Sequence, residues 1–135
     1  MRPGIPMAVW VALGSALGAM ARWGAGQLFD TAAVASFPWS TLGINTLGSI
    51  VIGLYAALTG VDGRLLVSAA HRQFVMTGIC GGFTTFSLFT AEVLTSLMRG
   101  DYPLTGSIIL VSVPAWLLGV WLGYAAGARW NRLPR

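Results

Sequence analysis

The stretch GICGGFTTFSLFTAE, residues 78–92, decides the fold, because it interrupts an apolar segment long enough to cross a membrane. Gly78, Gly81 and Gly82 are each poorer helix formers than alanine by ~1 kcal/mol. If the helix unwinds here, carbonyl oxygens are released at membrane depth, where they must be buried in protein, line water or bind a cation. Alternatively, the glycines let a neighbouring helix approach closely. The residues alone leave both explanations open.

The composition places the chain in a lipid bilayer. Of its 135 residues, 56% are hydrophobic and 9% are charged, whereas a soluble domain carries about 25% charged residues. So few ionised groups cannot cover a soluble surface. The sequence contains no lysine, and its arginines are scattered through the flanks of apolar segments. This pattern excludes nucleic acid as a partner, since a nucleic-acid binder gathers its cations in a patch.

Four apolar stretches predict four transmembrane helices. Each exceeds the ~20 residues that a helix needs to cross the hydrocarbon core. Trp39, Tyr102 and Trp130 fall near segment ends, where amphipathic rings favour the headgroup zone. Short connections make residues 1–135 a single domain with both termini on one side, and so thin a bundle is expected to self-associate. The predicted spans are residues 6–29, 38–61, 72–97 and 104–128.

The sequence offers no sign of catalysis. His71 is the only histidine and is assigned to the second connection, and Cys80 is the only cysteine. No metal-ligand cluster or nucleophile–base pair is visible in the pattern, so we predict that the protein is not an enzyme. Glycines recur at four-residue spacing in the first and fourth spans, which predicts close helix packing. They are Gly14 and Gly18, then Gly119, Gly123 and Gly127.

Polar residues inside the spans carry more information, because each must find a partner or line a wet cavity. Thr41 and Asn45 are four residues apart and share one helix face. Asn45 is either a hydrogen-bonding contact between helices or an ion contact. Arg22 either extends to the membrane interface or caps a vestibule that draws in anions. Glu92 is either a proton or cation site or an interfacial residue.

Phe86 and Phe89 are three residues apart and therefore lie on one face of the helix that resumes after the glycines. Such rings usually face lipid or the protein core. The edge of an aromatic ring is also the positive end of its quadrupole. Two inward edges could therefore contact a small anion without a fixed charge, and conduction needs binding weak enough to release the ion.

Three motifs together resemble a known family. The segments GGFTTFSLFTAE, TLGINTLGS and GSALGAMARW are similar, in order, to the third-, second- and first-helix signatures of the Fluc/CrcB fluoride channels. The resemblance covers essentially the whole chain. It implies an all-α membrane protein with four transmembrane helices and a broken third helix, assembled as an antiparallel, dual-topology homodimer. The implied function is passive export of cytoplasmic fluoride across the bacterial inner membrane, through two pores per dimer with a central structural Na⁺.

The resemblance also assigns roles to residues. Backbone carbonyls of Gly81 and Thr84 would bind sodium, and Arg22 would line the vestibule. Two fourth-helix positions depart from the family pattern: Trp116 stands where a small or hydroxyl residue is common, and Ile108 where the family often has tyrosine. The residues assigned to the fluoride pathway are Asn45, Phe86, Phe89, Thr41, Thr85, Ser87, Ser112 and Glu92.

The arginine distribution bears on topology, because an excess of Lys and Arg marks cytoplasmic loops. Six arginines lie on the side of the termini, whereas Arg99 and, marginally, Arg22 lie on the other. This bias leaves a heterodimer of paired genes open beside the dual-topology homodimer.

Two other functions are weighed against a channel. A small proton-coupled four-helix exporter of organic cations is the first, and it needs a membrane carboxylate, typically in the first span. That span has none, so only Glu92 is available. The second is a non-transporting assembly subunit, in which replacing Asn45 or Phe86 would change no flux.

Overall fold

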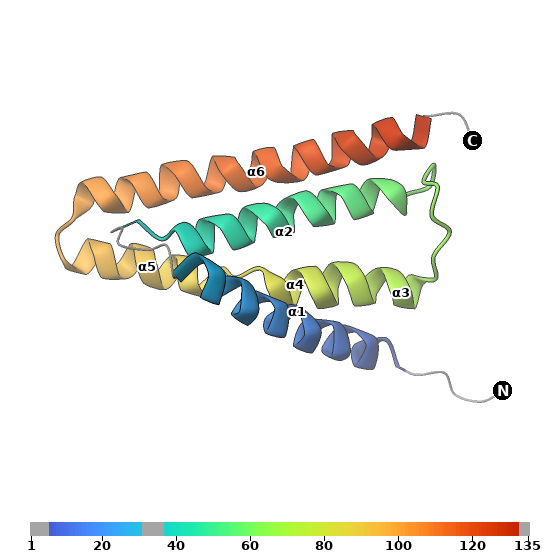
Figure 1. The fold of residues 1–135 in the computed structure, drawn as a ribbon, viewed down its shortest axis with the longest axis horizontal. Helices are drawn as coiled ribbons and strands as arrows, with labels where there is room; N and C mark the ends of the chain where they lie inside the picture. The colour runs from blue at the N-terminus through green and yellow to red at the C-terminus, as the bar shows by residue number, and fades with distance from the viewer. Residues whose placement is uncertain (1–5, 31–36, 133–135) are drawn as a thin grey trace.

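The protein is an all-helical bundle in the part of the chain that its computed structural model describes, residues 6–30 and 37–132. The elements are α1 (Met7–Asp30), α2 (Trp39–Leu58), α3 (Ala69–Gln73), the π-helix η1 (Phe74–Cys80), α4 (Gly81–Phe83), α5 (Ser87–Met98) and α6 (Tyr102–Arg132). Figure 1 shows four passes along the long axis, with α3, η1, α4 and α5 forming the third. The start of α1 and the end of α6 lie at the same end of the bundle, as the even number of passes requires.

Three of these passes are long and apolar enough to cross a membrane: Trp39–Leu58, Ala69–Met98 and Tyr102–Arg132. The first pass, α1, has sufficient length at 24 residues, but it is not among the three. Four glycines, Ser15 and Arg22 dilute its apolar residues. The protein is therefore a multi-pass membrane protein in which α1 carries the weakest apolar signal.

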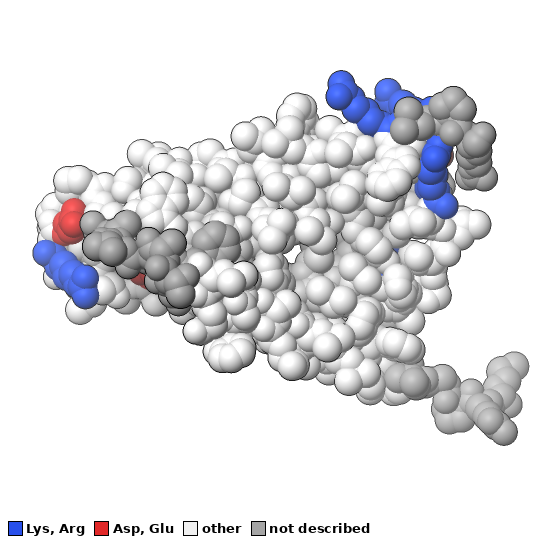
Figure 2. All heavy atoms as spheres, viewed as in Figure 1, with Lys and Arg blue, Asp and Glu red and all other residues white. Residues whose placement is uncertain are grey.

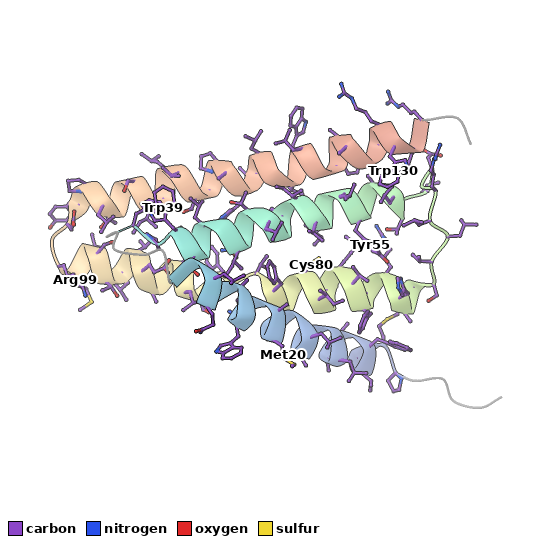
Figure 3. The ribbon with its side chains drawn as sticks, viewed as in Figure 1. Met20, Trp39, Tyr55, Cys80, Arg99 and Trp130 are labelled. Carbon is purple, nitrogen blue, oxygen red and sulfur yellow. The ribbon has the colours of Figure 1, made fainter. Side chains whose placement is uncertain are left out.

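The distribution of charged side chains agrees with passes that cross a bilayer. Figure 2 shows arginine side chains gathered at the two ends of the visible face, with an uncharged band between them. Figure 3 places Trp39 and Arg99 toward one end of the bundle and Trp130 at the other. Trp39 and Trp130 are both 52% exposed, as expected for rings in the headgroup zone. Arg2 and Arg135, which count toward the arginine bias, lie outside the described residues.

Close packing between helices depends on the glycines at four-residue spacing, as predicted. A Cβ added to Gly123 would lie 2.1 Å from the carbonyl oxygen of Ile50, and one added to Gly18 would lie 2.2 Å from that of Ile79. Both contacts are with backbone, which cannot rotate away. Small residues thus bring α6 against α2 and α1 against η1, the arrangement that replaces hydrophobic association inside lipid.

The third pass is interrupted, as predicted, but the break does not fall at the glycines. Gly78 lies in η1, and Gly81 and Gly82 open α4, so all three are helical. Gly78 and Gly82 serve the alternative role: a Cβ on either would lie within 3 Å of backbone atoms of α1. The chain leaves the helix at Thr84, where φ is −78° and ψ is 160°.

One smaller expectation is wrong. His71, assigned from sequence to the second connection, lies in α3, because Ser68 caps that helix and accepts a hydrogen bond from the His71 backbone N–H at 3.2 Å. Its Nδ1 lies 2.9 Å from the Tyr55 hydroxyl, which ties the start of the third pass to α2.

Candidate functional site: an interrupted helix beside an uncharged cleft

The interruption of the third pass occupies residues 84–86, between the end of α4 at Phe83 and the start of α5 at Ser87. The Thr84 N–H and hydroxyl both donate to the Cys80 carbonyl, at 3.0 and 2.9 Å. Figure 3 places Cys80 near the middle of the bundle, so the break lies at membrane depth. At this depth every freed backbone group needs a partner, because lipid supplies none.

Asn45 supplies the partners for Thr85. Its Nδ2 donates to the Thr85 carbonyl at 2.7 Å, and its Oδ1 accepts from the Thr85 backbone N–H at 2.7 Å. The two residues are 5% exposed each and 40 positions apart in the chain. One amide thus replaces both hydrogen bonds that Thr85 loses when the helix ends. Leaving either backbone group unpaired would cost about 1–3 kcal/mol.

The hydroxyl of Thr85 then starts the next helix. It accepts a hydrogen bond from the Leu88 backbone N–H at 3.3 Å, as an N-terminal cap does, and lies 3.3 Å from the Ser87 hydroxyl. The predicted pathway residues Thr85, Ser87 and Asn45 are therefore brought together in one hydrogen-bonded group at the break.

Thr41 and Glu92 form a second polar pair. The Thr41 hydroxyl donates to Glu92 Oε1 at 2.6 Å, which joins α2 to α5. The other carboxylate oxygen, Oε2, is buried and has no hydrogen-bond partner among the described residues. Because Thr41 and Asn45 are four residues apart on α2, this pair lies one turn away from the break.

The two phenylalanines are neighbours, but their environments differ. The Phe86 and Phe89 ring centroids are 5.5 Å apart. Phe86 is 68% exposed, whereas Phe89 is 7% exposed and meets the Trp116 ring edge-on at a centroid distance of 4.9 Å. Of the two rings, only Phe86 is thus open to an ion or a second chain. Phe89 contacts the rings of both Phe86 and Trp116.

A cleft of about 280 Å³ opens beside the break. It lies between α2 and the third pass, with α6 contributing Trp116. None of its lining residues carries a charge, so its polar side-chain groups are hydroxyls, the Asn45 amide, the Cys80 thiol and the Trp116 indole N–H. The lining residues are Asn45, Gly48, Ser49, Ile52, Met76, Cys80, Gly81, Thr84, Thr85, Phe86 and Trp116.

Gly81 and Thr84, the predicted sodium ligands, both line this cleft. A Cβ on Gly81 would meet nothing within 4 Å, so its backbone is open to another molecule. The last four carbonyls of a helix have no partner within that helix, and the Gly81 carbonyl is one of these, whereas Thr84 lies beyond the helix in extended conformation. Unwound carbonyls at a helix end are oxygen donors of the type that binds Na⁺ in transporters, so the residues present fit such an ion.

Six of the predicted site residues are not among those that line this cleft: Arg22, Thr41, Ser87, Phe89, Glu92 and Ser112. Arg22 lines a separate cleft of about 310 Å³ with residues of α2 and α5, among them Ser40, Ile44 and Leu88. Ser112 and Ile108 are each 2% exposed, one turn apart on α6. Ile108 thus fills a buried position with an apolar side chain, which explains how the chain accommodates it.

Sequence reasoning missed two features. It did not anticipate that Asn45 would bond to the backbone of the break, because the sequence near residue 85 does not indicate a hydrogen-bond partner 40 positions away. It also passed over Ser96 and Thr105, whose hydroxyls are buried 2.8 Å apart and join α5 to α6. Their place near the short connection between these helices was the available signal.

The fold and the cleft define a small multi-pass membrane protein whose interrupted helix presents uncharged polar groups at membrane depth. Residues 9–124 match the family described as CrcB-like protein, Camphor Resistance (CrcB). The chain belongs to this family, whose relatives are named as ion channels and not as enzymes.

Individual relatives align along most of their length. The chain is 47% identical over 126 residues to "Fluoride-specific ion channel FluC 1" of Bradyrhizobium diazoefficiens, covering 93% of this chain and 87% of that one. It is 48% identical over 122 residues to "Fluoride-specific ion channel FluC" of Paramagnetospirillum magneticum, with 90% and 95% covered. A protein of Rhodopseudomonas palustris, also named "Fluoride-specific ion channel FluC 1", is 49% identical over 124 residues, with 91% and 87% covered.

Proposed function

We propose that this chain is a fluoride-selective passive channel that exports cytoplasmic fluoride across a bacterial inner membrane. The observation that carries the proposal is the break at residues 84–86, held by Asn45 beside a cleft that no charged residue lines. The names of the relatives supply the identity of the ion. Hydroxyls, an amide and ring edges can replace part of the hydration of a small anion without holding it as tightly as a fixed cation would.

We further propose an antiparallel homodimer with two pores along the interface between the subunits. One chain has four passes and an open cleft, and the exposed Phe86 and open Gly81 backbone lie at that cleft, where a second copy could complete a pathway. The Glu92 Oε2 lacks a partner in the described residues, and water or another chain could supply its hydrogen-bond donor.

A structural Na⁺ held by the carbonyls of Gly81 and Thr84 belongs to the same proposal. When bound there, its positive charge would offset part of the cost of an anion near the bilayer midplane. The chain's own contribution is to end α4 at Phe83 and to turn Thr84 out of the helix, beside the cleft that Gly81 and Thr84 both line.

Fluoride efflux from liposomes tests the function. Liposomes with the purified protein are loaded with fluoride, and release is recorded with a fluoride-selective electrode, with and without a protonophore. A passive channel releases fluoride at a rate set by the fluoride gradient and the membrane voltage, and it requires no proton gradient. Release that depends on a proton gradient and disappears in Glu92→Gln would favour the coupled exporter instead. If the unsubstituted protein releases no fluoride either with or without the protonophore, the assembly subunit is favoured.

The orientation of the chain tests the homodimer. A single cysteine at a C-terminal tag, in a Cys80→Ser background, is expected to react with a membrane-impermeant maleimide from both sides of the membrane in roughly equal parts. The arginine bias favours termini on the cytoplasmic side, and this bias predicts labelling from one side only. Labelling from one side only would exclude the antiparallel homodimer and favour a paired-gene heterodimer.

A further inference from the structure

Trp116 departs from the pattern of the family resemblance, and the structure shows where it lies. It is a residue of α6, yet it lines the cleft at the break together with Asn45, Thr85 and Phe86. The position that the resemblance leaves without a hydroxyl is therefore taken, at the candidate pathway, by a residue with one hydrogen-bonding group, the indole N–H.

That group is an uncommitted donor. The indole Nε1 is buried and has no hydrogen-bond partner among the described residues. An indole N–H can only donate, so the oxygen or other acceptor that it needs must come from outside these contacts. The Asn45 amide differs in part, since its Oδ1 and one of its two Nδ2 hydrogens are bonded to Thr85.

The ring is also held in place. Trp116 meets Phe89 at an interplanar angle of 74° and a centroid distance of 4.9 Å, and Phe89 in turn contacts Phe86. Offset and edge-on aromatic pairs of this kind are favourable beyond the area that they bury. The indole N–H is therefore oriented by the same rings that flank the cleft.

We propose that the Trp116 indole N–H donates a hydrogen bond to fluoride in the cleft and so supplies from α6 the donor that a hydroxyl would otherwise provide. This inference rests on the proposed function. A neutral donor suits such a site, because it can replace one water of the ion's hydration shell and still release the ion. Trp116 is then a specificity-determining residue of this chain.

The Trp116→Phe variant tests the inference, since it removes the N–H and keeps an aromatic ring in contact with Phe89. Fluoride efflux is expected to fall about 5- to 10-fold, the effect of losing one hydrogen bond of ordinary strength. Trp121→Phe is the matched control, on the same helix but 63% exposed, and its efflux is expected to equal that of the unsubstituted protein. Size-exclusion elution and circular dichroism verify that both variants fold.

A second readout separates ion contact from packing. The indole ¹H–¹⁵N signal of Trp116, identified by its loss in Trp116→Phe, is expected to shift on titration with fluoride and not with equal chloride. The Trp121 signal should not move. Reduced efflux without a shift, an equal shift with chloride, or unchanged efflux would each overturn the inference while the channel function stands. If the unsubstituted protein releases no fluoride, the proposed function fails, and the inference fails with it.

Discussion

Replacing Asn45 by alanine is expected to lower the thermal stability of the protein and to reduce fluoride efflux from liposomes by more than tenfold. The side chain satisfies both the N–H and the carbonyl of Thr85, at 2.7 Å each. Its removal leaves two buried backbone groups unpaired at membrane depth, at about 1–3 kcal/mol each. The break is then expected to lose its fixed shape, together with the cleft that it borders.

Thr46→Val is the matched control for this prediction. Thr46 is adjacent on α2, but its hydroxyl donates only to the Leu42 carbonyl of its own helix. This variant should unfold and conduct as the unsubstituted protein does. The two measurements also separate two roles of Asn45. A fall in efflux with unchanged unfolding temperature would show that Asn45 acts on the ion alone, and would contradict its role in holding the break.

Replacing both Phe86 and Phe89 by isoleucine is expected to reduce fluoride efflux at least about tenfold, equivalent to ~1.4 kcal/mol in the barrier. Isoleucine keeps an apolar side chain but removes the ring edges that can meet an anion. It also removes the contact through which Phe89 orients Trp116. Efflux is measured with a fluoride-selective electrode at equal protein content.

Phe74→Ile provides the comparison. Phe74 is the first residue of η1, away from the break, and its ring packs edge-on against Trp10. The substitution changes the same residue type and is expected to leave efflux near its original rate. Efflux of the double variant within twofold of the original would remove both rings from the pathway, although the break itself would be unaffected.

The third pass shows how far sequence reasoning reached. The residues of 78–92 left an interrupted helix open, the family resemblance predicted it, and the interruption is present. The glycines suggested the wrong location, because intrinsic propensity is a weak preference that tertiary contacts override. Gly78 and Gly82 remain helical against α1, whereas the chain breaks at Thr84, beside a residue for which Asn45 supplies both hydrogen bonds.

Sequence reasoning named more of the residues of the candidate site than of the hydrogen bonds between them. Asn45, Thr85 and Ser87 were expected near one another, and hydrogen bonds join them. The bond between Thr41 and Glu92 was not foreseen, although both residues were named. Such pairings depend on the rotation of two helices about their axes, which periodicity within each helix cannot supply.

The amino-acid sequence by itself determined that the chain enters a bilayer and that it makes several helical passes, and it left open whether the glycines of the third pass break the helix or pack against a neighbour. Those properties follow from composition, apolar length and local backbone preference, which act within a single segment. Only the tertiary structure decided where the interruption falls, which polar groups are already satisfied and which, like the Trp116 indole N–H, are left without a partner. Hydrogen bonding between distant segments decides these matters, because in lipid each backbone group must find its partner inside the protein.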